Sequence, residues 1–340
     1  MGEAGRPARR ADVVRRTAVA GWPVSSPRDL ISSRDTALVR PPLIPLALST
    51  SAGPHCMPSR LPLPASRRLF LLLACFCLVG LTPCWAQPAP VKTLILPGES
   101  FLVAERPAFI LWPEPKLRRE PQPWVCYAPT LPPYPDEHEK WMHQRFLEAG
   151  VAVCGIDVGE AYGSPQGREW FSKLYEELTQ GRGFARQPCL LGRSRGGLWV
   201  TAWAAEHPDR VAGLAGIYPV FDLRSYPGLE RAAPAFQLTP SALEQQLAAH
   251  NPINRVSVLA KAAIPVCLIH GDQDEVVPLA QNSNAFREVY RQAGAEKHVQ
   301  LIVAKGQGHN YWEGFFRSPE LVEFVIARAK AGAAAPKKAD

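Results

Sequence analysis

The chain has 340 residues, of which 38 are basic and 31 acidic, so its formal net charge is +7. The excess lies in residues 1–86, which carry 11 of the basic and 4 of the acidic residues, so residues 87–340 are neutral overall. A nucleic-acid-binding protein keeps its basic excess on the folded domain. The charge therefore argues against nucleic-acid binding, and the length allows one large domain or two small ones.

The N-terminal part of the sequence predicts a secretory signal peptide at residues 57–86. Arg67 and Arg68 precede an apolar run at residues 69–81, and Cys84-Trp85-Ala86 forms a small-x-small cleavage site. The run is shorter than the roughly 20 residues that cross a bilayer as a helix. We therefore expect a secreted or periplasmic protein, cleaved near Ala86 and without a stable membrane span, and a signal anchor is the alternative. Residues 1–56 are interpreted as a disordered extension or as untranslated sequence upstream of Met57.

Four cysteines remain after the predicted cleavage. They are Cys126, Cys154, Cys189 and Cys267. Export would permit disulfides, but each of these cysteines lies inside an apolar strand-like run, and free cysteine is among the most buried residue types. We predict four buried thiols in a central sheet. No CxxC pair or Cys/His cluster indicates a metal site, and the sequence implies no cofactor.

From residue 91 onward, strand-like apolar runs alternate with helical patterns, which predicts a mostly parallel sheet with helices on both faces. Strands are expected at residues 91–96, 109–112, 124–128, 151–157, 188–192, 211–220, 265–270 and 299–304. Helices are expected at residues 137–149, 165–180, 195–207, 240–250, 278–293 and 319–330. Asp136, Ser164 and Thr239 are the predicted N-caps of the first, second and fourth helices.

These elements predict one domain at residues 87–330. Residues 221–262 form the longest connection in the alternating pattern and contain one evident helix. We expect this segment to be a small insertion that acts as a partial lid. Residues 331–340 are expected to be a disordered tail.

The most informative segment is Gly192-Arg193-Ser194-Arg195-Gly196, which follows an apolar strand and opens a helix. This is the G-x-S-x-G pattern of a nucleophile elbow in its required context of strand, sharp turn and helix. The turn strains the serine backbone and exposes its hydroxyl above the sheet. The flanking glycines allow the strand and the helix to approach each other closely. Ser194 is therefore the candidate nucleophile.

Two later segments supply partners for this serine. Asp274 follows the strand at 265–270, and His309 follows the strand at 299–304. A serine hydroxyl needs an imidazole to accept its proton, and a carboxylate orients that imidazole. Asp272 and, more weakly, Asp222 remain alternative acids, and His270 is expected to be structural.

The segments GRSRGG, HGDQDEVVP and GQGHN resemble the dienelactone-hydrolase and prolyl-oligopeptidase-like branches of the α/β-hydrolase superfamily, over roughly residues 91–330. The resemblance implies a three-layer fold and a triad in the chain order Ser194, Asp274, His309. It also implies that the amide of Arg195 is one donor of the oxyanion hole. The second donor follows the third strand, where Pro129 has no N–H, so Thr130 is preferred to Leu131.

The two arginines beside Ser194 stand at a helix N-terminus, where the helix dipole disfavours cations. Arg193 and Arg195 therefore indicate an anion, either a substrate carboxylate or sulfate, or a carboxylate of the protein such as Glu160. An arginine directly after the serine also resembles the glucuronoyl esterases, whose pattern the rest of the chain does not follow. Tyr162, Tyr311 and Trp312 are the aromatic candidates for a substrate pocket, which would suit a sugar or aryl ester.

These observations predict a serine hydrolase that acts through an acyl-enzyme, with a small-molecule or polysaccharide ester as substrate. The alternative is peptide hydrolysis of the prolyl-oligopeptidase type, whose members usually carry a large N-terminal propeller that we do not expect here. A third possibility is a non-catalytic binding protein on the same fold. The oligomeric state is not predicted by the sequence.

Overall fold

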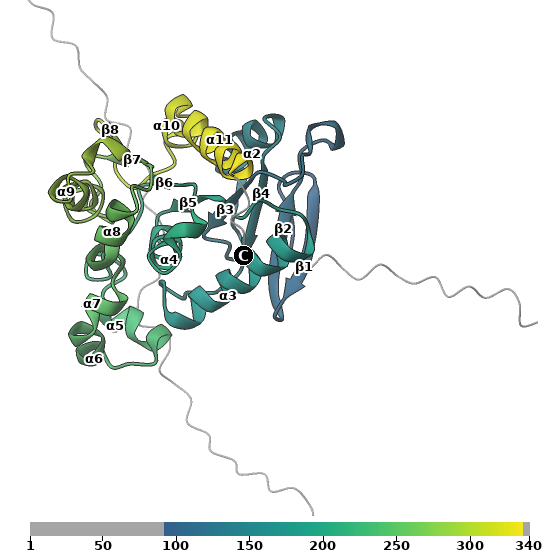
Figure 1. The fold of residues 1–340 in the computed structure, drawn as a ribbon. Helices are drawn as coiled ribbons and strands as arrows, with labels where there is room; N and C mark the ends of the chain where they lie inside the picture. Colours follow the sequence, from purple (N-terminus) through teal and green to yellow (C-terminus); the bar gives the residue numbers. More distant parts are fainter. Residues whose placement is uncertain (1–91, 336–340) are drawn as a thin grey trace, which may run out of the picture. The chain divides into compact units, whose positions relative to one another are not determined.

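An eight-stranded sheet runs through the part of the chain that the computed structural model describes, residues 92–335 (Figure 1). Its strand order is β1-β2-β4-β3-β5-β6-β7-β8. The first strand pairs antiparallel with the second, and the second antiparallel with the fourth, while all other neighbours are parallel. The strands are β1 (Gly98–Val103), β2 (Arg106–Leu111), β3 (Trp124–Ala128), β4 (Ala152–Ile156), β5 (Cys189–Arg193), β6 (Gly213–Ile217), β7 (Val266–Gly271) and β8 (Val299–Ala304).

The central strands are continuous apolar runs because both faces of the sheet are covered. Every residue of β3, β4, β5, β6 and β7 is buried. The four cysteines lie in these strands as free, buried thiols, which confirms that prediction. Burial raises the pKa of Cys126 and Cys267 to about 12, so these thiols stay protonated.

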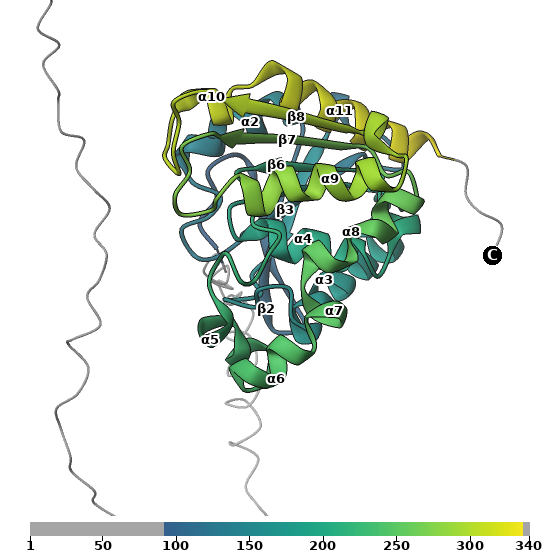
Figure 2. The same cartoon turned by 90° about the vertical axis from the view of Figure 1, so that its left-hand side faces the viewer.

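Helices cover both faces of the sheet and make the three layers that the sequence predicts (Figures 1 and 2). One face packs against α2 (Glu137–Glu148), α10 (Glu313–Phe316) and α11 (Pro319–Ala334). The other packs against α3 (Pro165–Glu176), α4 (Gly196–Ala204), α8 (Pro252–Lys261) and α9 (Ala285–Gln292). Asp136 and Ser164 cap α2 and α3 as predicted. Short helical turns are η2 (Pro115–Leu117), η3 (Glu177–Gly181), η4 (Pro208–Arg210), η6 (Ala280–Asn284) and η7 (Glu296–His298).

The predicted strand at residues 91–96 is wrong. Leu94, Ile95 and Leu96 instead pack against the core on the α2 face, and Lys92 Nζ donates hydrogen bonds to the carbonyl oxygens of Thr130 and Leu131, both at 3.0 Å. The apolar run therefore anchors the chain to the core without joining the sheet. The first strand is β1, a partly exposed edge strand whose apolar character is weaker.

The long connection after β6 holds more helix than the sequence indicated. It contains α5 (Leu229–Ala232), η5 (Ala233–Phe236), α6 (Pro240–Gln245) and α7 (Leu247–His250) before α8. The predicted helix at residues 240–250 is thus divided into two. Thr239 caps α6 as predicted, and α8 lies against α4 and α9 in the helix layer. In Figure 1, α5, α6 and α7 lie below α8.

Several predictions concern the two ends of the chain. The signal peptide and the extension at residues 1–56 lie outside the described residues. The last helix continues past residue 330 to Ala334, so the start of the expected tail is helical. Among residues 92–335, no helix combines the length and the apolar character that crossing a membrane requires.

Candidate active site

Ser194 stands in the sharp turn between β5 and α4. Its φ is +50°, in the left-handed region that a non-glycine residue adopts only under constraint. A Cβ on Gly192 would lie 2.8 Å from the Cα of Gly197, and a Cβ on Gly196 would lie 2.2 Å from the carbonyl oxygen of Ala128. Both contacts are shorter than real Cβ contacts. The two glycines are therefore required by close approach of backbone, as the elbow pattern predicts.

The structure brings Ser194, His309 and Asp274 together at the carboxyl ends of β5, β7 and β8. Ser194 Oγ lies 3.0 Å from His309 Nε2, and His309 Nδ1 lies 2.8 Å from Asp274 Oδ2. Because Nδ1 faces a carboxylate, it carries the proton, which leaves Nε2 free to accept one from the serine. The arrangement is that of a nucleophile, a base and an orienting acid.

Asp274 is a buried carboxylate with a full set of donors. Its Oδ1 accepts hydrogen bonds from the backbone N–H groups of Val276 at 3.0 Å and Val277 at 2.8 Å. Its Oδ2 also lies 3.3 Å from His270 Nε2. Burial opposes the charge, but the hydrogen bonds from His270, His309 and Val277 outweigh it and hold the pKa of Asp274 below its usual range. The carboxylate is therefore ionised at neutral pH.

The competing residues are placed elsewhere. Asp272 Oδ1 accepts from the backbone N–H of Gly306 at 2.7 Å, which ties together the loops after β7 and β8. Asp222 Oδ1 accepts from Asn251 Nδ2 at 2.8 Å. His270 Nδ1 lies 2.8 Å from Ser283 Oγ and its Nε2 lies 2.8 Å from the carbonyl oxygen of Val277, so the ring is fixed next to Asp274.

The loop after β3 lies against the start of α4, as the close approach of Gly196 to Ala128 shows. Thr130 is buried there, and its hydroxyl donates to the carbonyl oxygen of Ile156. Within residues 92–335, the backbone N–H groups of Thr130 and Arg195 donate to no other protein atom. The two N–H groups that the sequence predicts for the oxyanion hole are thus not engaged by the described residues, and Thr130 is fully buried.

Arg193 is not at the mouth of the site. It is 4% exposed, and its Nη1 lies 3.1 Å from both Asp136 Oδ2 and Glu139 Oε2. Side chains alternate along a strand, so Arg193 shares the α2 face with Cys189 and Leu191. Of the two anions that the sequence left open, Arg193 thus meets carboxylates of the protein, Asp136 and Glu139, and it is not placed to bind a substrate anion.

Arg195 pairs with Glu160, the internal partner that the sequence left open. Its guanidinium also lies 6.0 Å from the centre of the Tyr226 ring. Tyr162 is 3% exposed, and burial, with a smaller contribution from Glu160, raises its pKa to about 12. Tyr162 therefore belongs to the core beside this ion pair and offers little surface to a substrate.

The two aromatic residues after His309 differ in position. Tyr311 stacks on His138 with ring centres 4.0 Å apart and lies 5.1 Å from the Arg193 guanidinium. Trp312 is 44% exposed and packs its ring edge-to-face on Phe315. Of this pair, Trp312 offers the larger surface to a ligand.

Tyr218 was not identified from the sequence, although it contacts the candidate base. It directly follows β6, and its ring centre lies 4.3 Å from that of His309. Its φ of +35° is unusual for an aromatic residue. A lone tyrosine after a strand carries no sequence signal that would distinguish it from a core residue.

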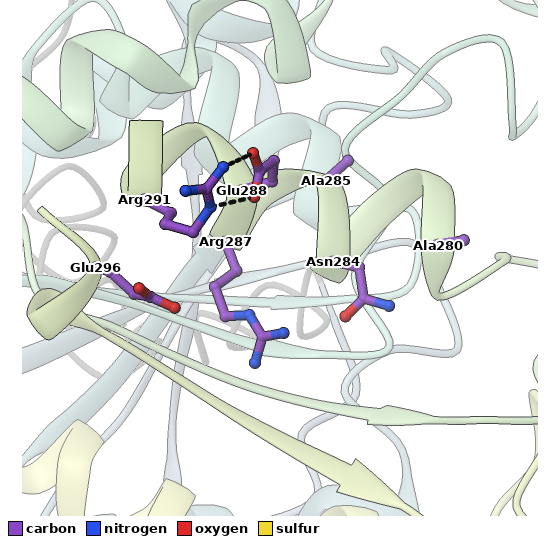
Figure 3. Close-up of a pocket in the computed structure, with 7 residues that line it drawn as sticks. All are labelled: Ala280, Asn284, Ala285, Arg287, Glu288, Arg291 and Glu296. Atoms are coloured by element: carbon purple, nitrogen blue, oxygen red, sulfur yellow. Dashed lines mark hydrogen bonds and ion pairs between the residues drawn. The ribbon is translucent and has the colours of Figure 1, made fainter. Parts of the chain in front are cut away.

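A separate hollow lies on the surface along α9. It is lined by Ala280, Asn284, Ala285, Arg287, Glu288, Arg291 and Glu296 (Figure 3). Arg291 Nε donates to Glu288 Oε2 at 2.7 Å, an ordinary ion pair on a helix surface. None of the residues of the candidate triad lines this hollow.

Comparison with known proteins identifies the family of the chain. The sequence profile of the prolyl oligopeptidase family matches residues 145–327, more than half of the chain, and this range includes Ser194, Asp274 and His309. No curated protein matches the sequence.

Solved structures share the fold at low sequence identity. A puromycin-hydrolyzing peptidase from Mycobacterium tuberculosis matches with a TM-score of 0.53 and 18% identity, over 71% of this chain and 40% of that one. Dipeptidyl peptidase 4 from Porphyromonas gingivalis gives 0.52 and 18%, over 71% and 36%. The S-formylglutathione hydrolase from Staphylococcus aureus gives 0.50 and 13%, over 65% and 92%. The chain thus spans less than half the length of the two peptidases.

The family match and the shared fold answer the question of class. The chain belongs to the prolyl oligopeptidase family, and it has the α/β-hydrolase fold.

Proposed function

We propose that this protein hydrolyses carboxylic esters by acyl transfer, with Ser194 as nucleophile, His309 as general base and Asp274 as the acid that orients the imidazole. The observation that carries the proposal is the continuous relay from Ser194 Oγ to His309 Nε2 at 3.0 Å and from His309 Nδ1 to Asp274 Oδ2 at 2.8 Å. Both distances lie within hydrogen-bond reach, as proton transfer between these groups requires.

In the proposed mechanism, His309 Nε2 accepts the proton of Ser194 while Oγ attacks the ester carbonyl carbon. The negative charge that develops on the carbonyl oxygen is stabilised by the amides of Arg195 and Thr130. The imidazolium then gives its proton to the departing alcohol, which leaves an acyl-enzyme on Ser194. His309 next takes a proton from water, the hydroxide attacks the acyl carbon, and the acid is released as the serine regains its proton.

An ester of an uncharged acyl group fits the surroundings best. Arg195 and Glu160 neutralise each other next to the nucleophile, and Arg193 is surrounded by carboxylates. The loops that carry the acid and the base expose apolar side chains, Val276 at 50% and Trp312 at 44%. Paired charges near the nucleophile, and apolar surface on the loops that carry the acid and the base, favour an acyl or aryl group over a charged one. An aryl ester or an acylated sugar is therefore the proposed substrate class.

Peptide hydrolysis is the second candidate, and membership of the prolyl oligopeptidase family favours it. The same triad would serve, with His309 giving its proton to the departing amine.

Export from the cell, which would bring the enzyme to extracellular esters, is also a proposal and rests on residues 57–86.

The test compares the full chain with its Ser194→Ala variant on p-nitrophenyl acetate and on an alanyl-prolyl p-nitroanilide. We expect ester cleavage in the wild type and a loss of about 10⁴-fold or more in kcat in the variant, because removing the nucleophile removes the covalent route. Anilide cleavage that depends on Ser194 would replace the esterase by a peptidase. Equal activity of the two proteins on the ester would overturn the role of Ser194.

A further inference from the structure

A buried polar cluster lies on the α2 face directly below the candidate triad. Its centre is Arg193, whose guanidinium contacts Glu139 and Asp136 at 3.1 Å and faces the rings of Tyr134 at 4.9 Å and Phe316 at 5.1 Å. Burial opposes its charge, but Glu139, ahead of the other neighbours, raises the pKa of Arg193. The guanidinium is therefore charged and held from several sides at once.

A further interaction of Arg193 leads to the candidate base. Arg193 Nε donates a hydrogen bond to the hydroxyl of Tyr218 at 3.3 Å. The Tyr218 ring packs against the His309 ring, with centres 4.3 Å apart and planes at 54°. Phe315 packs edge-to-face on the same tyrosine at 4.9 Å. Tyr218 is 2% exposed and is thus fixed at its hydroxyl and along its ring.

The backbone of Tyr218 is tied to the same region. Its N–H donates to the carbonyl oxygen of Ile269 at 2.8 Å, and Ile217 before it and Val220 two residues after it bond to the serine turn. Ser194 N–H donates to Ile217 at 2.9 Å, and Val220 N–H donates to the carbonyl oxygen of Ser194 at 2.8 Å. Tyr218 is therefore fixed relative to the nucleophile as well as to the base.

The His309 imidazole needs a contact of this kind. It stands in a loop between Gly308 and Asn310 and is held by hydrogen bonds at Nδ1 and Nε2. Two hydrogen bonds in the plane of the ring restrain it only weakly against tilting out of that plane, where the bond from Cγ to Cβ is the other restraint. A rigid surface against the ring face opposes this tilting, and small displacements of a reacting group cost large factors in rate.

We propose that Tyr218 is a positioning residue for the His309 base, and that Arg193 holds Tyr218 in place through its hydroxyl. Arg193 thus acts on the reaction through Tyr218, from beneath the nucleophile. This inference rests on the proposed role of His309.

The test uses the full chain with Tyr218→Phe, which removes the hydroxyl and keeps the ring. The matched control is Tyr290→Phe, since Tyr290 is also fully buried and its hydroxyl donates to the carbonyl oxygen of Ile264 at 3.1 Å in another part of the core. We expect Tyr218→Phe to lower kcat on p-nitrophenyl acetate about 10-fold with KM within about twofold, because the base is displaced while binding is kept. Tyr290→Phe should leave both constants unchanged, even where it lowers the melting temperature.

Arg193→Lys and the double variant that combines it with Tyr218→Phe test whether Arg193 acts through Tyr218. The lysine keeps the charge but lacks the Nε–H donor. If Arg193 acts through Tyr218, the double variant should lose no more kcat than the more affected single variant, because the two changes break one interaction. Losses that multiply would show that Arg193 acts by another route. An equal kcat for Tyr218→Phe and Tyr290→Phe would overturn the proposal, whether or not Arg193→Lys folds.

A readout without substrate separates this proposal from the proposed function. In protein labelled with ¹⁵N-histidine, the His309 imidazole signals are assigned by their loss in His309→Asn. We expect them to broaden or split in Tyr218→Phe and to remain unchanged in Tyr290→Phe. A wild type inactive on every ester would refute the proposed function, and these signals would still decide whether Tyr218 fixes the imidazole. Unchanged signals in Tyr218→Phe would refute the positioning role.

Discussion

Asp274 keeps its charge although it is buried, because the N–H groups of Val276, Val277 and His309 converge on its two oxygens and His270 lies beside them. The spacing in the sequence was enough to prefer Asp274 over Asp272 as the acid, but it did not identify His270 as a second histidine beside Asp274. His270 is the penultimate residue of β7, and only the fold shows that its ring reaches Asp274 Oδ2 at 3.3 Å. A histidine at the end of a buried strand has no sequence mark that separates support of an acid from ordinary packing.

We predict that Asp274→Asn lowers kcat by about 10⁴-fold, since the amide no longer stabilises the imidazolium and favours the wrong tautomer. The folded pKa of Asp274 lies below its unfolded value. Its contribution to the free energy of unfolding is therefore fully present above about pH 4, the ordinary aspartate pKa, and is lost as the pH falls below it.

Urea unfolding of wild type and Asp274→Asn between pH 3 and pH 7 measures this contribution. The stability difference between the two proteins should be largest near neutral pH and should shrink toward pH 3. A difference that grows as the pH falls would contradict an ionised, donor-stabilised Asp274.

The position of Arg193 was predicted from the helix that follows it, although the strand that contains it decides which way its side chain points. The dipole at the start of α4 suggested an anion-binding role, but Arg193 is the last residue of β5 and follows the alternation of that strand to the α2 face. Its partners Asp136 and Glu139 come from the N-terminus of α2. Which helix would cover that face is a property of the fold, and the sequence alone did not specify it.

At the scale of elements, the close approach of the β3 loop to α4 is the contact on which the site depends. We predict that Gly196→Ala lowers both the melting temperature and kcat, with kcat falling about 100-fold, because the new Cβ must push the Ala128 carbonyl or the helix away. Gly181→Ala is the matched control, since its Cβ would meet only the Glu177 side chain at 3.9 Å.

Thermal unfolding and ester kinetics of the two variants provide the measurement. Gly181→Ala should retain the kcat of the wild type. A Gly196→Ala variant with wild-type kcat would show that the β3 loop and α4 do not have to meet at this distance.

The error at residues 91–96 has a similar origin. An apolar run can enter a sheet or anchor a chain against one, and its composition is the same in both cases. The true edge strand, β1, is partly exposed and pairs antiparallel with β2. The central strands were predicted well because burial on both faces leaves a continuous apolar run.

At the scale of the whole molecule, the order of strands and helices and the order Ser194, Asp274, His309 together pointed to the fold and to the class of enzyme. The strand order of the sheet then explains how residues up to 115 positions apart meet, because β5, β7 and β8 are parallel and end at one edge. What the sequence left open is what depends on side-chain direction, namely the buried Arg193 cluster, the Arg195–Glu160 pair and Tyr218.

The central claim is that Ser194 is a nucleophile activated by His309, and covalent labelling tests it most directly. The full chain would be treated with a fluorophosphonate, and the modified peptide would be identified by mass spectrometry in the wild type, Ser194→Ala and His309→Asn. The account predicts one label on Ser194, none in Ser194→Ala, and labelling at least about 100-fold slower in His309→Asn, since the base is removed. Labelling of another residue, or an equal rate in His309→Asn, would contradict it.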